Sequence, residues 1–86
     1  MALFIIERNF AEQLDLDRAT ALNIVDVNDE CGVHWVYSFL SADKKKTYCL
    51  YEAPNAEAIR EAARRLGLPA DVIIELDSQI RPEVYA

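Results

Sequence analysis

The chain has few of the residues that build specialised scaffolds. Its 86 residues include two cysteines, two glycines and three prolines. So few cysteines exclude a disulfide-stapled mini-protein, and so little glycine excludes a collagen-like repeat. The sequence has no GxGxxG turn, P-loop or GxSxG elbow. Dinucleotide, nucleotide and serine-hydrolase functions therefore have no support.

Basic residues are also scarce. Nine lysines and arginines stand against 15 acidic residues, which gives a net charge of -6. This balance works against the neutralisation of phosphates that drives nucleic-acid binding, so we expect no nucleic-acid partner. The one basic cluster, Lys44-Lys45-Lys46, follows Asp43 and is typical of a solvated hairpin tip.

Long apolar segments are absent as well. The run from Ala2 to Ile6 stops at charged residues and has no basic leader, so we expect neither a signal peptide nor a membrane span. With Cys31 and Cys49 as the only thiols, a cytoplasmic protein with reduced cysteines is predicted.

The composition that remains describes one globular domain. Apolar residues make up 52% of the chain, which is too many for a disordered segment. We expect a single domain over 1–86, with a core at about 2–77 and a C-terminal tail at 78–86. A chain this short buries only about 60 to 65% of its unfolded surface. An apolar-rich chain of this size is therefore expected to complete its core as a homodimer.

Four strands and two helices are predicted from local patterns. The strands are expected at 2–9, 33–40, 47–53 and 72–76, and the helices at 16–30 and between Asn55 and Gly67. Asp15 or Asp17 is available to cap the first helix, and Gly32 ends it. This order predicts an α+β ferredoxin-like βαββαβ fold, in which both helices cover one face of a four-stranded antiparallel sheet.

The second helix has the clearer pattern. Apolar residues recur at helical spacing at Ile59, Ala62, Ala63 and Leu66. Two surface ion pairs are expected to support this helix, namely Glu57 with Arg60 and Glu61 with Arg65.

The strand at 33–40 is apolar on both of its faces, which one layer of helices cannot cover. A second subunit packed on the open face of the sheet would cover the other side. We therefore expect two sheets packed face to face, as in a dimeric α+β barrel.

The register of the predicted hairpin decides which side chains share a face. An even-numbered turn places Cys49 opposite Ser38 and Tyr51 opposite Val36. The side chains then expected on the dimer-facing surface are His34, Val36, Ser38, Thr47, Cys49 and Tyr51. Those expected against the helices are Trp35, Tyr37, Phe39, Tyr48 and Leu50. An odd-numbered turn would exchange the two sets.

Three residues of the dimer-facing surface are candidate metal ligands: His34, Glu7 and Cys49. Imidazole, carboxylate and thiolate groups bind nickel and other divalent transition metals. Each residue also has a structural reading. His34 could be a hydrogen-bonded strand residue, Cys49 a small buried hydrophobe, and Glu7 a strand-end carboxylate that reaches water.

A second hypothesis is a small organic ligand in the barrel interior, bound or transformed by Ser38, Tyr51 and Cys49. A catalytic pair of Cys49 and His34 would need an orienting acid and an oxyanion site, and no glycine-rich loop supplies the latter. A binding protein is therefore favoured over an enzyme. A structural or interaction module without a site is the third alternative.

Several segments resemble a known family. They are His34-Trp35-Val36-Tyr37-Ser38, the run from Asp43 to Pro54, and Glu57-Ala58-Ile59-Arg60-Glu61-Ala62-Ala63-Arg64. Together they resemble the small bacterial domain of unknown function 4242, also called the nickel-binding-protein family, from Ile6 to about Leu76. The resemblance implies a ferredoxin-like subunit, a dimeric α+β barrel and nickel binding in at least some members. It implies no established reaction.

Overall fold

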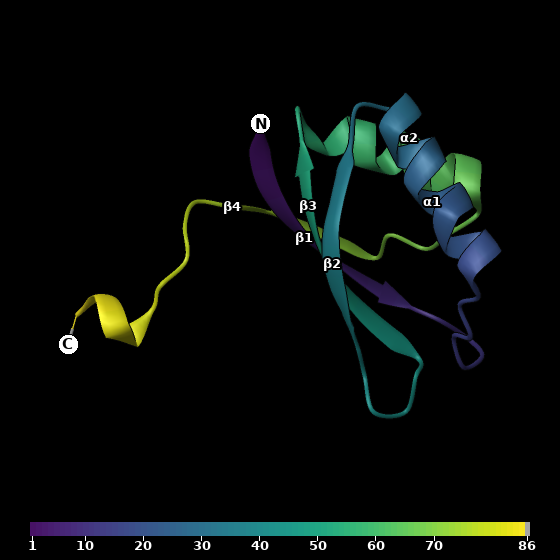
Figure 1. The fold of residues 1–86 in the computed structure, drawn as a ribbon, viewed down its shortest axis with the longest axis horizontal. Coiled ribbons are helices and arrows are strands. Elements are labelled where there is room, and N and C mark those ends of the chain that lie inside the picture. The colour runs from purple at the N-terminus through teal and green to yellow at the C-terminus, as the bar shows by residue number, and fades with distance from the viewer. Residues whose placement is uncertain (86) are drawn as a thin grey trace.

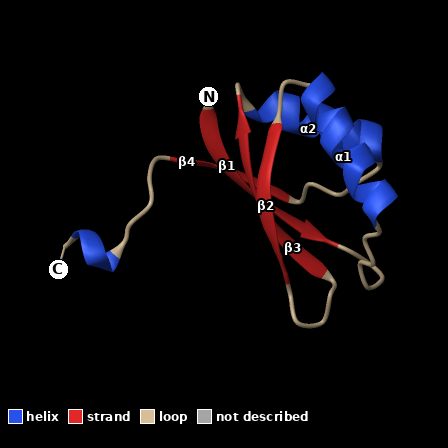
Figure 2. Ribbon diagram, in the orientation of Figure 1, coloured by secondary structure: helices blue, strands red, loops and turns tan. Residues whose placement is uncertain are grey.

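The computed structural model describes residues 1–85, and Ala86 lies outside the described part. The elements are β1 (Ala2–Asn9), α1 (Arg18–Glu30), β2 (His34–Leu40), β3 (Lys46–Ala53), α2 (Ala56–Leu66), β4 (Val72–Leu76) and a 3-10 turn, η1 (Pro82–Val84) (Figure 1). The strands form one sheet in the order β2-β3-β1-β4, and every pair is antiparallel. Both helices lie on one side of this sheet (Figure 2). The predicted ferredoxin-like α+β fold is confirmed.

Both helices begin at the side chains that their sequences offer as caps. Asp17 accepts a hydrogen bond of 2.8 Å from the backbone N–H of Thr20, and Asn55 accepts one of 2.9 Å from Ala58. Asp17 rather than Asp15 is the cap of α1, so this helix begins two residues later than the sequence predicts. The bond to the Thr20 N–H lowers the pKa of the Asp17 carboxyl below its ordinary value of 3.8.

Because the pKa of Asp17 is lowered, its contribution to the stability of the fold is lost at acid pH. A lowered carboxyl pKa stabilises the fold above the unfolded-state pKa, and this contribution is lost as the pH falls through the folded-state pKa. Asp17→Ala should therefore lower the melting temperature at pH 7, and the difference from wild type should shrink below pH 3.8. Asp26→Ala, at an exposed position in the middle of the same helix, is the control and should not lower the melting temperature at pH 7.

α2 ends as its sequence predicts. Gly67 follows the last turn with φ of 67°, in the left-handed region that glycine adopts without strain. Its N–H closes the helix on the carbonyl of Arg64.

The hydrophobic core lies between the sheet and the helices. Ile6 of β1, Ala53 of β3 and Ile59 of α2 have no exposed surface. Phe4 opposes Tyr51 across the β1–β3 ladder, and both are buried. Alternate residues of β1 and β3 thus face the helices, as the two-residue repeat of a strand requires.

The opposite face of the sheet carries no helix. Its apolar side chains are Leu3, Ile5, Tyr37, Phe39, Tyr48, Leu50, Val72, Ile74 and Leu76. We call this surface the open face. Phe39 is 63% exposed and Ile74 is 51% exposed. Tyr37 and Phe39 stand edge to face, with ring centroids 5.4 Å apart.

A β-bulge in β2 changes the predicted register. Ser38 opposes Cys49 as expected, but Tyr51 opposes Trp35 rather than Val36. The shift lies between Trp35 and Tyr37, so Val36 is the extra residue of the bulge. The bulge lets Trp35 and Ser38 face the same side although they are three residues apart, and the Trp35 Nε1–H donates to the Ser38 Oγ at 2.8 Å.

The predicted assignment of faces is wrong for most of the hairpin. Four residues expected to face a second subunit face the helices instead: Ser38, Thr47, Cys49 and Tyr51. Four residues expected to face the helices lie on the open face: Tyr37, Phe39, Tyr48 and Leu50. The physical reason is the pairing with β1. Phe4 and Ile6 must be buried, and they bring their partners Tyr51 and Cys49 with them.

The C-terminal tail leaves the body on the side away from the helices (Figure 1). Three of its apolar side chains are strongly exposed: Ile80 at 84%, Val84 at 72% and Tyr85 at 76%. No helix within residues 1–85 is long and apolar enough to cross a membrane.

Candidate functional site

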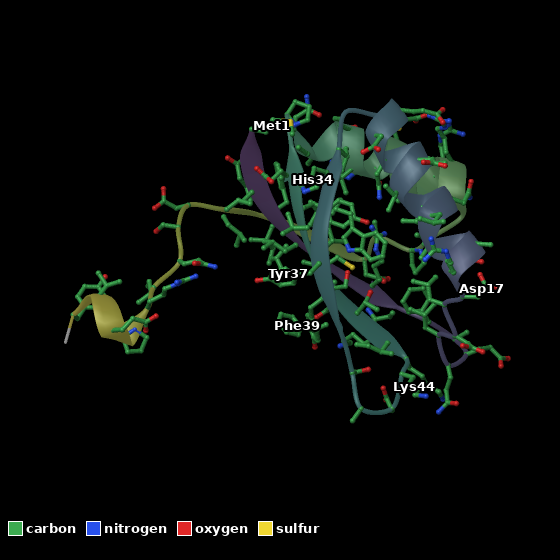
Figure 3. All side chains as sticks on the ribbon, in the orientation of Figure 1. Met1, Asp17, His34, Tyr37, Phe39 and Lys44 are labelled. Carbon is green, nitrogen blue, oxygen red and sulfur yellow. The ribbon has the colours of Figure 1, made fainter. Side chains whose placement is uncertain are left out.

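His34 lies on the open face, directly opposite Glu52. His34 is the first residue of β2, and Glu52 is its partner in β3. Figure 3 shows His34 at the end of the sheet near Met1. Directly opposed residues have Cβ atoms about 4.5 to 5.5 Å apart, so the imidazole and the carboxylate can approach one ion. Both groups are ligands for divalent transition metals.

Glu52 was missed in the sequence because of the bulge. A regular hairpin places Ala53 opposite His34, whereas the extra residue Val36 moves Glu52 into that position. The alternation of Tyr48, Leu50 and Glu52 was the available signal, since these residues share one face of the strand.

Glu7 shares the open face with His34 but lies at its far end. Glu7 opposes Tyr48, whereas the row of His34 and Glu52 continues to Leu3. Four residues of strand separate Leu3 from Glu7, which is about 13 Å. The Glu7 carboxylate instead lies 3.7 Å from the Lys46 Nζ. One chain therefore does not bring Glu7 and His34 to the same ion.

Cys49 lies on the other side of the sheet. It is 5% exposed, and its Sγ donates to the Thr47 Oγ1 at 3.5 Å. The predicted grouping of His34, Glu7 and Cys49 on one surface is therefore wrong. Within residues 1–85, no three His, Cys, Asp or Glu side chains form a group that could hold a metal ion.

A cavity of about 490 Å³ lies on the helix side of the sheet. Ser38, Cys49 and Tyr51 all line it, so the three residues predicted to bind an organic ligand do lie together. Their location differs from the prediction, because the cavity is formed within one chain and not between two sheets. Its apolar wall consists of Phe10, Leu14, Leu16, Ile24, Trp35, Leu40 and Leu68.

Arg8 is a buried charged residue of this cavity that the sequence did not predict. It is 3% exposed. Its guanidinium donates to the Pro69 carbonyl at 2.5 Å and to the Tyr51 hydroxyl at 3.3 Å, and it lies 5.7 Å from the centre of the Tyr51 ring. Arg8 continues the alternation of Phe4 and Ile6, and this was the signal that it would be buried.

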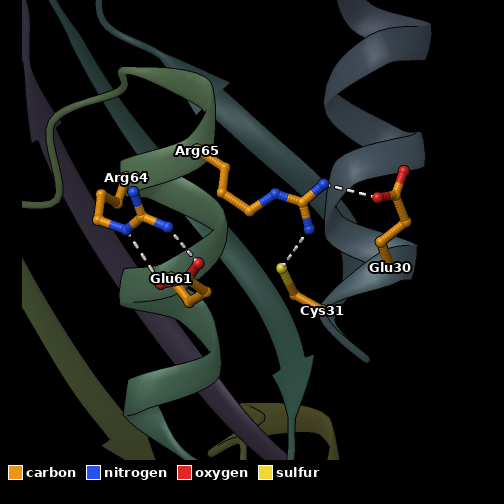
Figure 4. A network of polar contacts seen from close by, with 5 residues as sticks. All are labelled: Glu30, Cys31, Glu61, Arg64 and Arg65. Atoms are coloured by element: carbon orange, nitrogen blue, oxygen red, sulfur yellow. Dashed lines mark hydrogen bonds and ion pairs between the residues drawn. The ribbon is translucent and has the colours of Figure 1, made fainter.

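A second polar cluster joins the two helices near Cys31 (Figure 4). Arg65 of α2 donates to the Glu30 carboxylate at 2.6 Å and to the Cys31 Sγ at 3.5 Å. Glu61 therefore pairs with Arg64 at 2.5 Å and not with Arg65 as predicted. The hydrogen bond from Arg64 lowers the pKa of the Glu61 carboxyl. All of these contacts are exposed; those of Arg65 connect α2 to the C-terminal end of α1, whereas the pair of Glu61 and Arg64 lies within α2.

The last predicted pair, Glu57 with Arg60, is confirmed at 2.7 Å. It lies on the exposed surface of α2, so it supports the helix without contributing to a site.

Comparison with known proteins adds the family. A crystal structure of SCO4226 from Streptomyces coelicolor A3(2) is similar to this chain, with a TM-score of 0.79 and 25% identity over 92% of this chain and 100% of the other. No curated protein matches the chain. The model of the family described as "Nickel responsive protein SCO4226-like" matches residues 4–76. The chain therefore belongs to the SCO4226-like family of nickel responsive proteins.

Proposed function

We propose that this protein binds nickel, or a similar divalent transition metal, through His34 and Glu52 on the open face of the sheet. The observation that supports this function is the direct opposition of these two residues in a chain of a nickel responsive family. No reaction is part of the proposal. We also propose a cytoplasmic location, which the two free cysteines support because thiols stay reduced there.

The donor types suit this class of metal. Imidazole binds nickel well, and carboxylate oxygens complete mixed sites. Two donors alone leave most coordination positions free, so water or a facing subunit completes the site. Glu7 contributes only from a second copy, because it lies about 13 Å along the strand from the row of His34. Cys49 is not part of this site, since it faces the helices.

The proposed functional unit is a homodimer formed through the open face. Several large apolar side chains are exposed there, including Phe39 and Ile74. A contiguous apolar surface on a strand-rich face is typical of an interface. The tail with Ile80 and Tyr85 leaves the body on the same side, where a second copy would receive it.

Calorimetric titration with nickel tests the metal site. His34→Ala and Glu52→Gln should each weaken nickel binding at least about tenfold, a loss of about 1.4 kcal/mol or more. Glu75→Gln, an exposed strand glutamate on β4 opposite Phe4, is the matched control and should bind as wild type does. Nickel binding should also weaken at acid pH, because a protonated imidazole cannot coordinate a metal.

Two outcomes would contradict this assignment. Equal nickel affinity in wild type and in His34→Ala would remove the histidine from the site. Loss of affinity in the Glu75→Gln control would show that the measurement reports general acidity and not a defined pair.

A further inference from the structure

The helix-side cavity holds a buried positive charge that has no carboxylate partner. Four salt bridges are formed among residues 1–85, and none of them includes Arg8. The partners of its guanidinium are a carbonyl and a hydroxyl, which are neutral. Burying an unpaired charge is costly unless an ion of opposite sign approaches it. The cavity therefore offers an anion a site that the chain itself does not fill.

The guanidinium has donors left for such an anion. Arginine carries five N–H donors, and two are used here, one by Pro69 and one by Tyr51. No buried polar side-chain atom within residues 1–85 lacks a partner. The Nε–H of Arg8, which makes no bond, must therefore keep accessible surface. A planar guanidinium with free N–H groups is suited to a carboxylate, which it can bind through two parallel bonds.

The remainder of the cavity suits an apolar body. Its volume of about 490 Å³ lies within the range of small-molecule sites. Trp35 and Leu40 from β2 and Ile24 from α1 contribute apolar surface, while Ser38 and Thr47 add a few polar groups. Asp15 and Lys44 also line the cavity. Their opposite charges offset each other, so Arg8 gives the lining its net positive charge.

We propose that this cavity binds a small organic carboxylate, with the carboxylate on Arg8 and an apolar chain or ring against Trp35 and Ile24. The site lies on the face of the sheet opposite His34 and does not depend on the proposed metal site.

The lone tryptophan provides the readout, because Trp35 lines the cavity. The probes are 4-phenylbutyrate and its neutral amide, which differ only in the charged group. Phenylbutyrate should change Trp35 fluorescence saturably at millimolar concentration or below. The amide should bind about tenfold or more weakly, since a hydrogen bond between two charged groups is stronger than one to a neutral group.

Arg8→Gln should remove the preference for the acid over the amide. Since Arg8 is buried, this variant could lose stability, and a second pair of variants avoids that problem. Thr20 is exposed, lines the cavity and occupies the third position of α1, where glutamate is favourable. Thr20→Glu should weaken phenylbutyrate more than the amide, whereas Thr20→Gln, which adds similar bulk without the charge, should change the binding of both probes by the same factor.

Three results would overturn the proposal. The first is equal binding of the acid and the amide by the wild-type protein. The second is no saturable change of Trp35 fluorescence with phenylbutyrate. The third is an unchanged preference for the acid in folded Arg8→Gln. Nickel titration of the same samples is the control for independence, and its result should not change with either probe.

Discussion

Ile74→Lys is expected to dissociate the proposed homodimer into monomers. Ile74 is 51% exposed on β4 and opposes Ile5 on the open face. In the proposed dimer this side chain is covered by the second copy, and a lysine there would bury an unpaired charge. The dimer dissociation constant should rise at least about 100-fold, which is a loss of about 2.8 kcal/mol of association free energy. Sedimentation at micromolar concentration measures the change.

The matched control for this variant is Leu22→Lys. Leu22 is 49% exposed on α1, on the helix side of the molecule. Leu22→Lys therefore also replaces an apolar side chain with lysine, at nearly the same exposure as Ile74→Lys. Leu22→Lys should remain a dimer. A wild-type protein that sediments as a monomer would refute the dimer, and dissociation by both variants would show that added charge acts nonspecifically.

The two lysine variants also test whether the second copy takes part in the proposed nickel site. His34 lies on the open face that the second copy would cover, and one chain supplies only the pair of His34 and Glu52. If the second copy completes the site, the Ile74→Lys monomer should bind nickel at least about tenfold more weakly than wild type. Leu22→Lys should bind as wild type does. Equal binding by the monomer would confine the site to one chain.

The order of elements could be predicted because local signals determine it. Asn55 and Gly67 bracket α2 as cap and left-handed terminator, and neither depends on the rest of the molecule. The ferredoxin-like topology then follows from the sequence of strands and helices alone. Such features are encoded within a few residues.

The faces of the hairpin could not be predicted in the same way. Whether a strand residue is buried depends on its partner strand, and a one-residue change of register exchanges the faces. The bulge at Val36 is such a change for His34 and Trp35, and nothing in the local sequence marks it. The prediction also took aromatic bulk as a sign of burial. Phe39, at 63% exposure, shows that bulk on a strand can instead be left for another surface.

The two polar residues that matter most were missed for different reasons. Glu52 opposes His34 only because of the bulge, whereas the burial of Arg8 follows the alternation of Phe4 and Ile6 along β1. Ser38 and Tyr51 were grouped correctly because their relation is local to one hairpin. The grouping of these hairpin residues was therefore predicted correctly, whereas the side of the sheet that each group faces was not, because a third strand or a bulge decides it.

Ile59→Ala should cause a large loss of stability. Ile59 is the fully buried residue through which α2 joins the core cluster of Phe4, Ile6 and Tyr51. Truncating a buried isoleucine costs about 2 to 5 kcal/mol, because apolar contacts are lost and a cavity remains. A domain of this size has a total free energy of unfolding of about 4 to 13 kcal/mol. The melting temperature should therefore fall by about 10 °C or more.

The control is Ile80→Ala in the tail, where the same side chain is 84% exposed. Its free energy of unfolding should stay within about 0.5 kcal/mol of wild type, because little surface is buried in the single chain. Urea denaturation followed by Trp35 fluorescence measures both variants. Equal stability of Ile59→Ala and Ile80→Ala would mean that α2 does not form the cover of this sheet face. If Ile80→Ala instead loses stability and the loss grows with protein concentration, the tail packs on a second copy, since only association makes stability depend on concentration.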